Sequence, residues 1–266
     1  MRELTFGYSP CPNDTFAFHA LTHDVLDLPF RIVPVLLDIE ELNRRAHEGA
    51  FDLTKLSVGA FAGVGDRYRM LRSGAALGHG VGPLVVTRTP MSLADAVRGR
   101  VAIPGRDTTA YRLLRLAAPA VGEAVEMRYD RILQAVRAAD VDAGLIIHES
   151  RFTYADHGLV QAVDLGDWWE RDTGLPVPLA AICARADLAV DMATAAERAI
   201  RASVQYAFDN PGASRSYVSS HAQEMSEEVC AAHIKLYVNS HSLDVGEDGM
   251  RAIARLVGAP DTQGGV

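Results

Sequence analysis

The sequence is poor in positive charge, and lysine in particular is almost absent. Its 266 residues include 26 Lys and Arg against 34 Asp and Glu, a formal net charge of −8, and the only lysines are Lys55 and Lys235. A negatively charged chain is repelled by phosphate backbones and anionic lipid head groups, so neither nucleic acid nor a membrane is an expected partner. No run of about 18 apolar residues is present, so no membrane-spanning helix is expected.

Cysteine is also scarce. Cys11, Cys183 and Cys230 are odd in number and lack C-x-x-C spacing, so we expect neither a disulfide framework nor a thiolate metal site. The start of the chain has no basic region followed by an apolar stretch of signal-peptide length, so we expect a cytoplasmic protein. A phosphate-binding fingerprint is missing too, because no helix is predicted directly after the glycine-rich segment 78–82, which is interpreted as a hinge or turn.

Segments with strand and helix patterns alternate through the first half of the chain. We predict strands at 4–8, 30–37, 51–55, 68–77, 101–103, 125–129 and 144–147. We predict helices after the loop 9–15, at 39–48, after Ser57, at 110–116 and from Asp130 to 138, with further helices between 191 and 256. This alternation is typical of α/β proteins with parallel sheets covered by helices on both faces. The polar, glycine-rich end at 258–266 is expected to fray.

Two further extended segments, 82–88 and 176–185, are interpreted as crossings between two lobes. If both cross, residues 89–177 form a smaller inserted α/β lobe, and residues 1–88 and 178–266 form a larger α/β lobe that contains the C-terminal helices. Two lobes joined by two crossing hinge strands are the architecture of type II periplasmic binding proteins, so we predict this α/β fold. Such lobes close over a ligand by hinge motion, and the cleft receives strand ends and helix N-termini from both sides.

Three loop-to-helix turns, at 9–15, 55–57 and 107–110, are expected to face that cleft. Hydroxyls and unpaired N–H groups at such turns suit a carboxylate or a phosphate. In the first turn, prolines forbid helix, and Asn13 or Asp14 is expected to cap the helix that follows. The simpler alternative, that Ser57 and Thr108 only cap helices, stays open for each turn taken alone.

His148 is the strongest single candidate for catalysis. It follows the apolar strand 144–147 at a position where α/β folds place ligand-contacting side chains, and histidine titrates near neutral pH. A purely structural role is the alternative. Glu149 is expected on the opposite face, so no His–Glu pair is assumed. His19 and His23 share one helix face, but no third metal ligand is evident, so no metal site is predicted.

Four motifs together resemble one family. They are S-P-C-P-N-D-T-F-A-F-H-A-L at 9–21, K-L-S at 55–57, T-T-A at 108–110 and I-I-H-E at 146–149. The resemblance is to the 1,4-dihydroxy-6-naphthoate synthases of the futalosine route to menaquinone, and it extends over nearly the whole chain. The first motif is long and specific, whereas the shorter ones are informative mainly through their order and spacing.

The resemblance implies a cytoplasmic carbon–carbon lyase with the two-lobed binding-protein fold and no metal or organic cofactor. This lyase converts cyclic dehypoxanthine futalosine, a carboxylated small molecule, into 1,4-dihydroxy-6-naphthoate and releases a three-carbon fragment. His148 matches the family's proton-accepting histidine. The substrate-binding residues carried over from the family are Lys55, Leu56, Ser57, Thr109 and Ala110, and the predicted turns add Ser9, Asn13 and Thr108.

Other functions use a similar fold. A non-catalytic solute-binding protein for a small carboxylate would share the cleft, but the missing export signal and a histidine expected inside the cleft argue against it. The related chorismate dehydratase shares the fold but is not known to have the Pro-Cys-Pro-Asn-Asp-Thr start. A ligand-sensing lobe of a transcription factor would need a DNA-binding segment, which we do not expect in this acidic sequence. Both a monomer and a homodimer stay possible.

Overall fold

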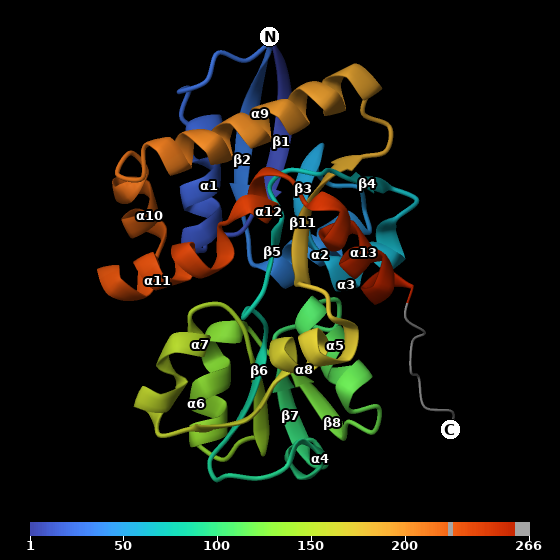
Figure 1. The fold of residues 1–266 in the computed structure, drawn as a ribbon, viewed down its shortest axis with the longest axis vertical. Helices are drawn as coiled ribbons and strands as arrows, with labels where there is room; N and C mark the ends of the chain where they lie inside the picture. The colour runs from blue at the N-terminus through green and yellow to red at the C-terminus, as the bar shows by residue number, and fades with distance from the viewer. Residues whose placement is uncertain (223–225, 259–266) are drawn as a thin grey trace.

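Two separate sheets, one in each lobe, organise the chain (Figure 1). The computed structural model describes residues 1–222 and 226–258. Of the segment 258–266, which we expect to fray, only Gly258 belongs to the described residues. Within the described ranges, no helix has both the length and the apolar character needed to cross a membrane.

The larger lobe is built on a six-stranded sheet. Its strand order is β2-β1-β3-β11-β4, and β5 also pairs with β11. The strands are β1 (Arg2–Tyr8), β2 (Phe30–Leu36), β3 (Leu53–Ser57), β4 (Tyr68–Met70), β5 (Ala76–Gly78) and β11 (Val177–Arg185). β1 runs parallel to β2 and β3, whereas β11 runs antiparallel to β3. The carboxyl ends of β1 and β3 therefore lie at the same edge of the sheet.

Helices cover both faces of this sheet. They are α1 (Pro12–Thr22), α2 (Ile39–Ala46), α3 (Val58–Val64), α9 (Val190–Asp209), α10 (Arg215–His221), α11 (Glu227–Tyr237), α12 (Ser240–Leu243) and α13 (Gly246–Val257). Alternate residues Leu4, Phe6 and Tyr8 of β1 are fully buried on one face of the sheet, as the period of a strand requires. The ring of Phe18 from α1 meets Phe6 edge-on at 5.1 Å between centroids. This packing fixes α1 against the strand that precedes it.

The smaller lobe has a five-stranded sheet in the order β10-β6-β9-β7-β8. Its strands are β6 (Leu84–Thr87), β7 (Arg100–Ile103), β8 (Glu123–Glu126), β9 (Ala143–Ile146) and β10 (Val160–Asp164). Its α-helices are α4 (Leu93–Ala96), α5 (Thr109–Ala117), α6 (Ile132–Arg137), α7 (Ser150–Thr153) and α8 (Leu165–Thr173), and its 3-10 helices are η1 (Tyr129–Arg131) and η2 (Tyr154–His157). β7 and β9 are parallel, so their carboxyl ends share one edge, which faces the larger lobe.

The chain crosses between the lobes twice, from β5 to β6 and from α8 to β11 (Figure 1). The two-lobed α/β prediction is confirmed, but the expected boundaries after residues 88 and 177 differ from the strand pairing. β6 already pairs with β9 and β10 in the smaller lobe, and Val177 already pairs with Gly78 in the larger one. The first crossing is therefore complete before Leu84, and the second is complete at Val177.

Most predicted strands have somewhat different bounds in the structure, and two of them differ most. The single strand expected at 68–77 is divided into β4 and β5 by a turn at Gly74, whose φ of +87° is suited to glycine. The strand expected at 125–129 ends at Glu126, and Tyr129 instead begins η1. Consequently Asp130 does not cap α6, because it lies inside that 3-10 helix.

The first crossing touches the start of α8 backbone to backbone. Gly82 has a φ of +143°, and a Cβ on it would lie 2.7 Å from Cα of Gly166. A Cβ on Gly166 would lie only 1.9 Å from the carbonyl oxygen of Val81. Arg151 adds a hydrogen bond of 2.9 Å to the Gly82 carbonyl and an ion pair with Asp164. Glycine at 166 is thus required by contact, because no side chain fits there.

We expect Gly166→Ala to lower the free energy of unfolding by about 1–3 kcal/mol, because the new methyl group forces the crossing and α8 apart. Denaturant unfolding followed by circular dichroism measures the change. Gly212→Ala is the matched control, since nothing lies within 4 Å of a Cβ at that position. Equal stability of the two variants would contradict the close contact.

Candidate active site

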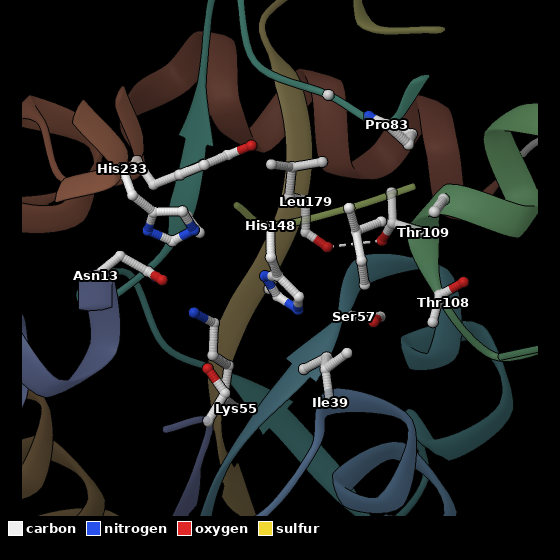
Figure 2. A pocket seen from close by; sticks show the side chains of 17 residues that line it. Asn13, Ile39, Lys55, Ser57, Pro83, Thr108, Thr109, His148, Leu179 and His233 are labelled. Atoms are coloured by element: carbon white, nitrogen blue, oxygen red, sulfur yellow. Dashed lines mark hydrogen bonds between the residues drawn. The ribbon is translucent and has the colours of Figure 1, made fainter. Parts of the chain in front are cut away.

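A cavity lies between the two sheets' facing edges, and both lobes line it (Figure 2). Its lining residues are Ser9, Asn13, Ile39, Lys55, Ser57, Ala76, Gly82, Pro83, Thr108, Thr109, Ala110, Ile147, His148, Leu179, Ala180, His233 and Tyr237. Every residue predicted for the site is among them except Leu56. The three predicted turns therefore do meet at one cavity. They meet because parallel strands in each lobe end at the edge that faces the other lobe.

Leu56 is the one predicted site residue whose side chain does not reach the cavity. It is 1% exposed and packs in a core cluster with Val64, Tyr68 and Cys183. Successive side chains of a strand point to opposite faces, so the placement of Lys55 and Ser57 in the cavity turns Leu56 away from it. A side-chain contact between Leu56 and a ligand in this cavity is therefore not supported.

A buried ion pair joins α1 to β3 beside the cavity. Lys55 Nζ contacts Asp14 Oδ1, and both side chains are almost fully buried. Asp14 also accepts hydrogen bonds from Ser9 Oγ at 2.7 Å and from Asn13 Nδ2 at 2.8 Å. Buried charges are stable only when they are paired and hydrogen-bonded in this way. Asp14 thus orients three cavity residues at once, a role that sequence reasoning missed.

The start of α1 differs from the expected one. The N-cap is Cys11, without a side-chain cap, and Pro12 occupies the first helical turn. Proline fits that position because the first N–H groups of a helix have no partner inside it. Neither Asn13 nor Asp14 therefore caps α1. Both are free to form the network with Lys55, and the oxygen of Asn13 points toward the cavity (Figure 2).

Ser57 is held by Asn43, a second residue that the sequence did not indicate. The Ser57 N–H donates to Asn43 Oδ1 at 3.0 Å, and Asn43 Nδ2 donates to Ser57 Oγ at 3.1 Å. Ser57 stands at the N-cap of α3, but its side chain does not cap that helix. Because its oxygen accepts from Asn43, its own O–H proton can be donated to a ligand.

The two threonine hydroxyls bind the protein itself. Thr108 caps α5 by accepting from the Tyr111 N–H at 3.2 Å, and it also lines the cavity. Thr109 donates to the Leu179 carbonyl at 2.6 Å (dashed in Figure 2) and accepts from the Gly59 N–H at 3.0 Å. Thr109 thereby ties α5 of the smaller lobe to β11 and α3 of the larger one.

The backbone at the start of α5 is the part left for a ligand. Among the described residues, no hydrogen bond is found for the N–H groups of Thr109 and Ala110. Free N–H groups in the first turn of a helix, together with the helix dipole, favour an anion. The cavity therefore offers two backbone donors here.

His148 stands near the centre of the cavity (Figure 2). It follows β9 with a φ of +56°, an uncommon conformation for a non-glycine residue, and its Nε2 has no hydrogen-bond partner among the described residues. Burial, with a smaller effect from the charge of Lys55, lowers the pKa of His148 to about 3. The imidazole is therefore neutral near pH 7, with a ring nitrogen free to accept a proton. No hydrogen bond joins it to Glu149, which begins α7 as its N-cap.

His233 is a second cavity histidine, and sequence reasoning missed it. Its side chain is 0% exposed, and neither ring nitrogen has a partner in the described part of the chain. Its only sequence signal is its position four residues before Tyr237, on the face of α11 that is buried.

A second cavity adjoins the first and shares Ser9 and His148 with it. Cys11 and Tyr129 line it as well. Burial raises the pKa of the Cys11 thiol, and nearby Glu149 adds to the effect. A thiol with a raised pKa is a poor nucleophile, so Cys11 is not equipped for covalent catalysis.

Over residues 1–222 and 226–258, no cluster of three or more His, Cys, Asp or Glu side chains could hold a metal ion. His19 and His23 stack on each other at 4.5 Å between ring centroids and do not line the cavity. The cavity instead combines a lysine cation, free N–H and O–H donors and neutral imidazoles. These groups suit binding of an anion next to a proton transfer.

Comparison with known proteins identifies the family. The model of a family described as "Menaquinone biosynthesis" matches residues 4–259. The chain belongs to this family. Two curated relatives bear the name 1,4-dihydroxy-6-naphthoate synthase. The one from Thermus thermophilus is 56% identical over 99% of this chain and 96% of its own length, and the one from Streptomyces coelicolor is 48% identical over 96% and 91%. The protein is therefore an enzyme of menaquinone biosynthesis.

Comparison with solved structures tests the fold. The crystal structure of protein AF1704 from Archaeoglobus fulgidus is 39% identical, with a TM-score of 0.91 over 96% of this chain and 95% of that one. The CA3427 gene product of Candida albicans, which has the generic periplasmic binding protein fold, is only 14% identical. Its TM-score is 0.70 over 98% and 93%. The predicted periplasmic-binding-protein-like fold is confirmed.

We expect Asp14→Asn to lower the free energy of unfolding by about 3–5 kcal/mol, because it leaves the buried charge of Lys55 without a counter-ion. The double variant Asp14→Leu with Lys55→Met should recover most of this loss, since it removes both buried charges. Chemical denaturation measures both. Glu3→Gln is the control, because the Glu3–Arg31 pair is exposed and should contribute less than about 1 kcal/mol. A loss for Asp14→Asn no larger than for Glu3→Gln would rule out a structural role of the buried pair.

The lowered pKa of His148 predicts an acid-sensitive fold. In the folded protein His148 has a pKa of about 3, whereas the free side chain titrates near 6.5. The contribution of the neutral His148 to the free energy of unfolding is therefore fully present above pH 6.5. It is lost as the pH falls from there toward 3. By about pH 5 the loss should reach about 2 kcal/mol.

Unfolding free energies of the wild type, His148→Asn and His157→Asn between about pH 7 and pH 5 measure this contribution. His148→Asn should show a shallower pH dependence than the wild type, by about 2 kcal/mol over that range. His157→Asn is the matched control, because His157 is exposed, and it should keep the wild-type slope. The same slope for all three proteins would contradict the burial of a neutral His148.

Proposed function

We propose that this protein is a 1,4-dihydroxy-6-naphthoate synthase, a carbon–carbon lyase that converts cyclic dehypoxanthine futalosine into 1,4-dihydroxy-6-naphthoate and a three-carbon fragment. The observation that carries the proposal is the neutral, unpartnered His148 in a cavity that also contains a lysine cation. The names of the two curated relatives support the same reaction.

The reaction makes modest demands on the protein. A carbon–carbon bond between the bicyclic ring and the sugar remnant breaks, and its electron pair passes into the ring system as an enolate. The ring then becomes aromatic, which supplies the driving force. The products contain all the atoms of the substrate, so the step needs neither water nor an oxidant. It needs a general base, hydrogen-bond donors to the enolate oxygen and groups that bind the substrate carboxylate.

His148 is the proposed base. Its neutral imidazole is available to accept a proton at physiological pH, because burial and Lys55 disfavour the charged form in the absence of substrate. A well-placed general base contributes about 10²–10⁴-fold to a rate. When the substrate brings its own negative charge into the cavity, that charge favours the imidazolium formed during the reaction.

The substrate carboxylate has three kinds of donor available. Lys55 supplies positive charge, Ser57 can donate its O–H proton, and the start of α5 presents the N–H groups of Thr109 and Ala110. Since the two threonine hydroxyls are already bound within the protein, we assign the ligand contact at 109–110 to the backbone. These donors come from both lobes, so binding favours the closed arrangement.

The alternative functions have less support. A non-catalytic solute-binding protein for a carboxylate needs hydrogen-bond donors and positive charge but no base, whereas this cavity also contains two buried histidines without partners among the described residues. A chorismate dehydratase would share the fold. The two curated relatives, however, match this chain over nearly their whole length, and both are named as the synthase.

We expect purified wild-type protein to form 1,4-dihydroxy-6-naphthoate from cyclic dehypoxanthine futalosine without any added cofactor. His148→Asn should abolish turnover and keep the substrate dissociation constant within about tenfold, because the base acts in the transition state. Absorbance and mass spectrometry measure the product, and calorimetry measures binding. His157→Asn serves as the control and should retain full activity.

Three results would count against the proposal. Tight binding without product would favour a solute-binding protein. Neither binding nor product would refute the assigned substrate. Turnover by His148→Asn at the wild-type rate would refute the assigned base.

A further inference from the structure

His233 has no structural partner that explains its burial. It belongs to α11 of the larger lobe, is 0% exposed, and both Nδ1 and Nε2 lack a hydrogen-bond partner in the described residues. Buried polar atoms in proteins are almost always hydrogen-bonded, and leaving one unpaired costs about 1–3 kcal/mol. Two unpaired nitrogens on one ring that lines the cavity point to a ligand as the missing partner.

The ring is placed to share a ligand with His148. The two ring centroids are 6.3 Å apart, and the amine of Lys55 also faces the space around them (Figure 2). Tyr237 packs against His233 at 4.6 Å between centroids and Phe152 lies at 6.4 Å, so aromatic rings hold the imidazole on two sides. A small group between His148 and His233 would contact both. Because His148 comes from the smaller lobe and His233 from the larger one, the pair exists only when the lobes are together.

The protonation states of the two histidines allow different roles. Burial, His148 and Lys55 all lower the pKa of His233 well below its usual value, so its ring is neutral like that of His148. A neutral imidazole has one nitrogen that accepts and one N–H that donates. In a site that excludes water, a neutral imidazole N–H is able to stabilise a developing oxyanion.

We propose that His233 is a second catalytic residue of the lyase, whose ring N–H donates a hydrogen bond to the substrate ketone oxygen as it becomes an enolate. This inference rests on the proposed function. His148 accepts the proton of a hydroxyl on the sugar remnant, the carbon–oxygen bond of that hydroxyl becomes a carbonyl, and the carbon–carbon bond to the bicyclic ring breaks. The bonding electron pair moves through the ring system to the ketone oxygen, which becomes the enolate oxygen hydrogen-bonded to His233. His148 then gives its proton to that oxygen, which becomes a hydroxyl of the product, so no net proton is consumed. The geometry thus divides proton acceptance and oxyanion stabilisation between the two lobes.

The test compares His233→Phe, His233→Asn and His233→Gln with the wild type. Phe removes both nitrogens, Asn places an amide nitrogen near the position of Nδ1, and Gln places one near that of Nε2. We expect His233→Phe to lower kcat by about 10²-fold or more, as removal of an oxyanion donor does. KM and the dissociation constant of 1,4-dihydroxy-6-naphthoate should stay within about threefold. One of the two amide variants should have a kcat at least about tenfold higher than that of His233→Phe.

Cys230→Ala is the matched control on the same helix, because Cys230 does not line this cavity, and its kcat should equal that of the wild type. Thermal unfolding shows whether each variant is folded. Wild-type kcat in His233→Phe would overturn the inference and leave the proposed function intact. A loss that neither amide variant reduces, or that appears equally in product binding, would overturn it as well. No product from the wild type would overturn both.

Discussion

The buried pair of Lys55 and Asp14 is the interaction on which the site depends. It links the start of α1 to the end of β3, and Asp14 fixes Ser9 and Asn13 through further hydrogen bonds. A lysine can be charged at this depth only because the carboxylate accompanies it. Burial is the main cause of the lowered pKa of His148 and His233, and the positive charge of Lys55 adds to it. The ion pair therefore holds the cavity residues in place and contributes to keeping both histidines neutral.

The two lobes divide the chemical tasks. The larger lobe supplies Lys55, Ser57 and His233, whereas the smaller lobe supplies His148 and the free N–H groups at the start of α5. Since each lobe alone presents an incomplete set, the site exists only where they meet. Thr109 and the glycine contact at the first crossing hold the lobes in register. The two-lobed arrangement that encloses a ligand in binding proteins here encloses the cavity of the proposed lyase.

The conformation of His148 connects the fold to the proposed chemistry. A φ of +56° for a histidine is unfavourable by about 1–3 kcal/mol and persists only where the surroundings enforce it. Here strand β9, which is paired along its length with β6, ends at the edge of the smaller lobe. The turn that follows places the His148 ring in the cavity, 4.9 Å from the ring of Tyr129 between centroids. Backbone strain and loss of hydration are both concentrated at the residue assigned as the base.

The sequence by itself determined the two-lobed α/β fold, the three turns that face the cleft and the position of His148. These follow from local patterns: strand periodicity, turn residues and the ends of apolar strands. Only the tertiary structure showed that Leu56 points away, that Thr109 bonds across the lobes, and that Asp14, Asn43 and His233 belong to the site. Those facts depend on contacts between segments far apart in the chain. His233 lies 85 positions after His148 in the sequence, and no local pattern records which buried atoms lack a partner.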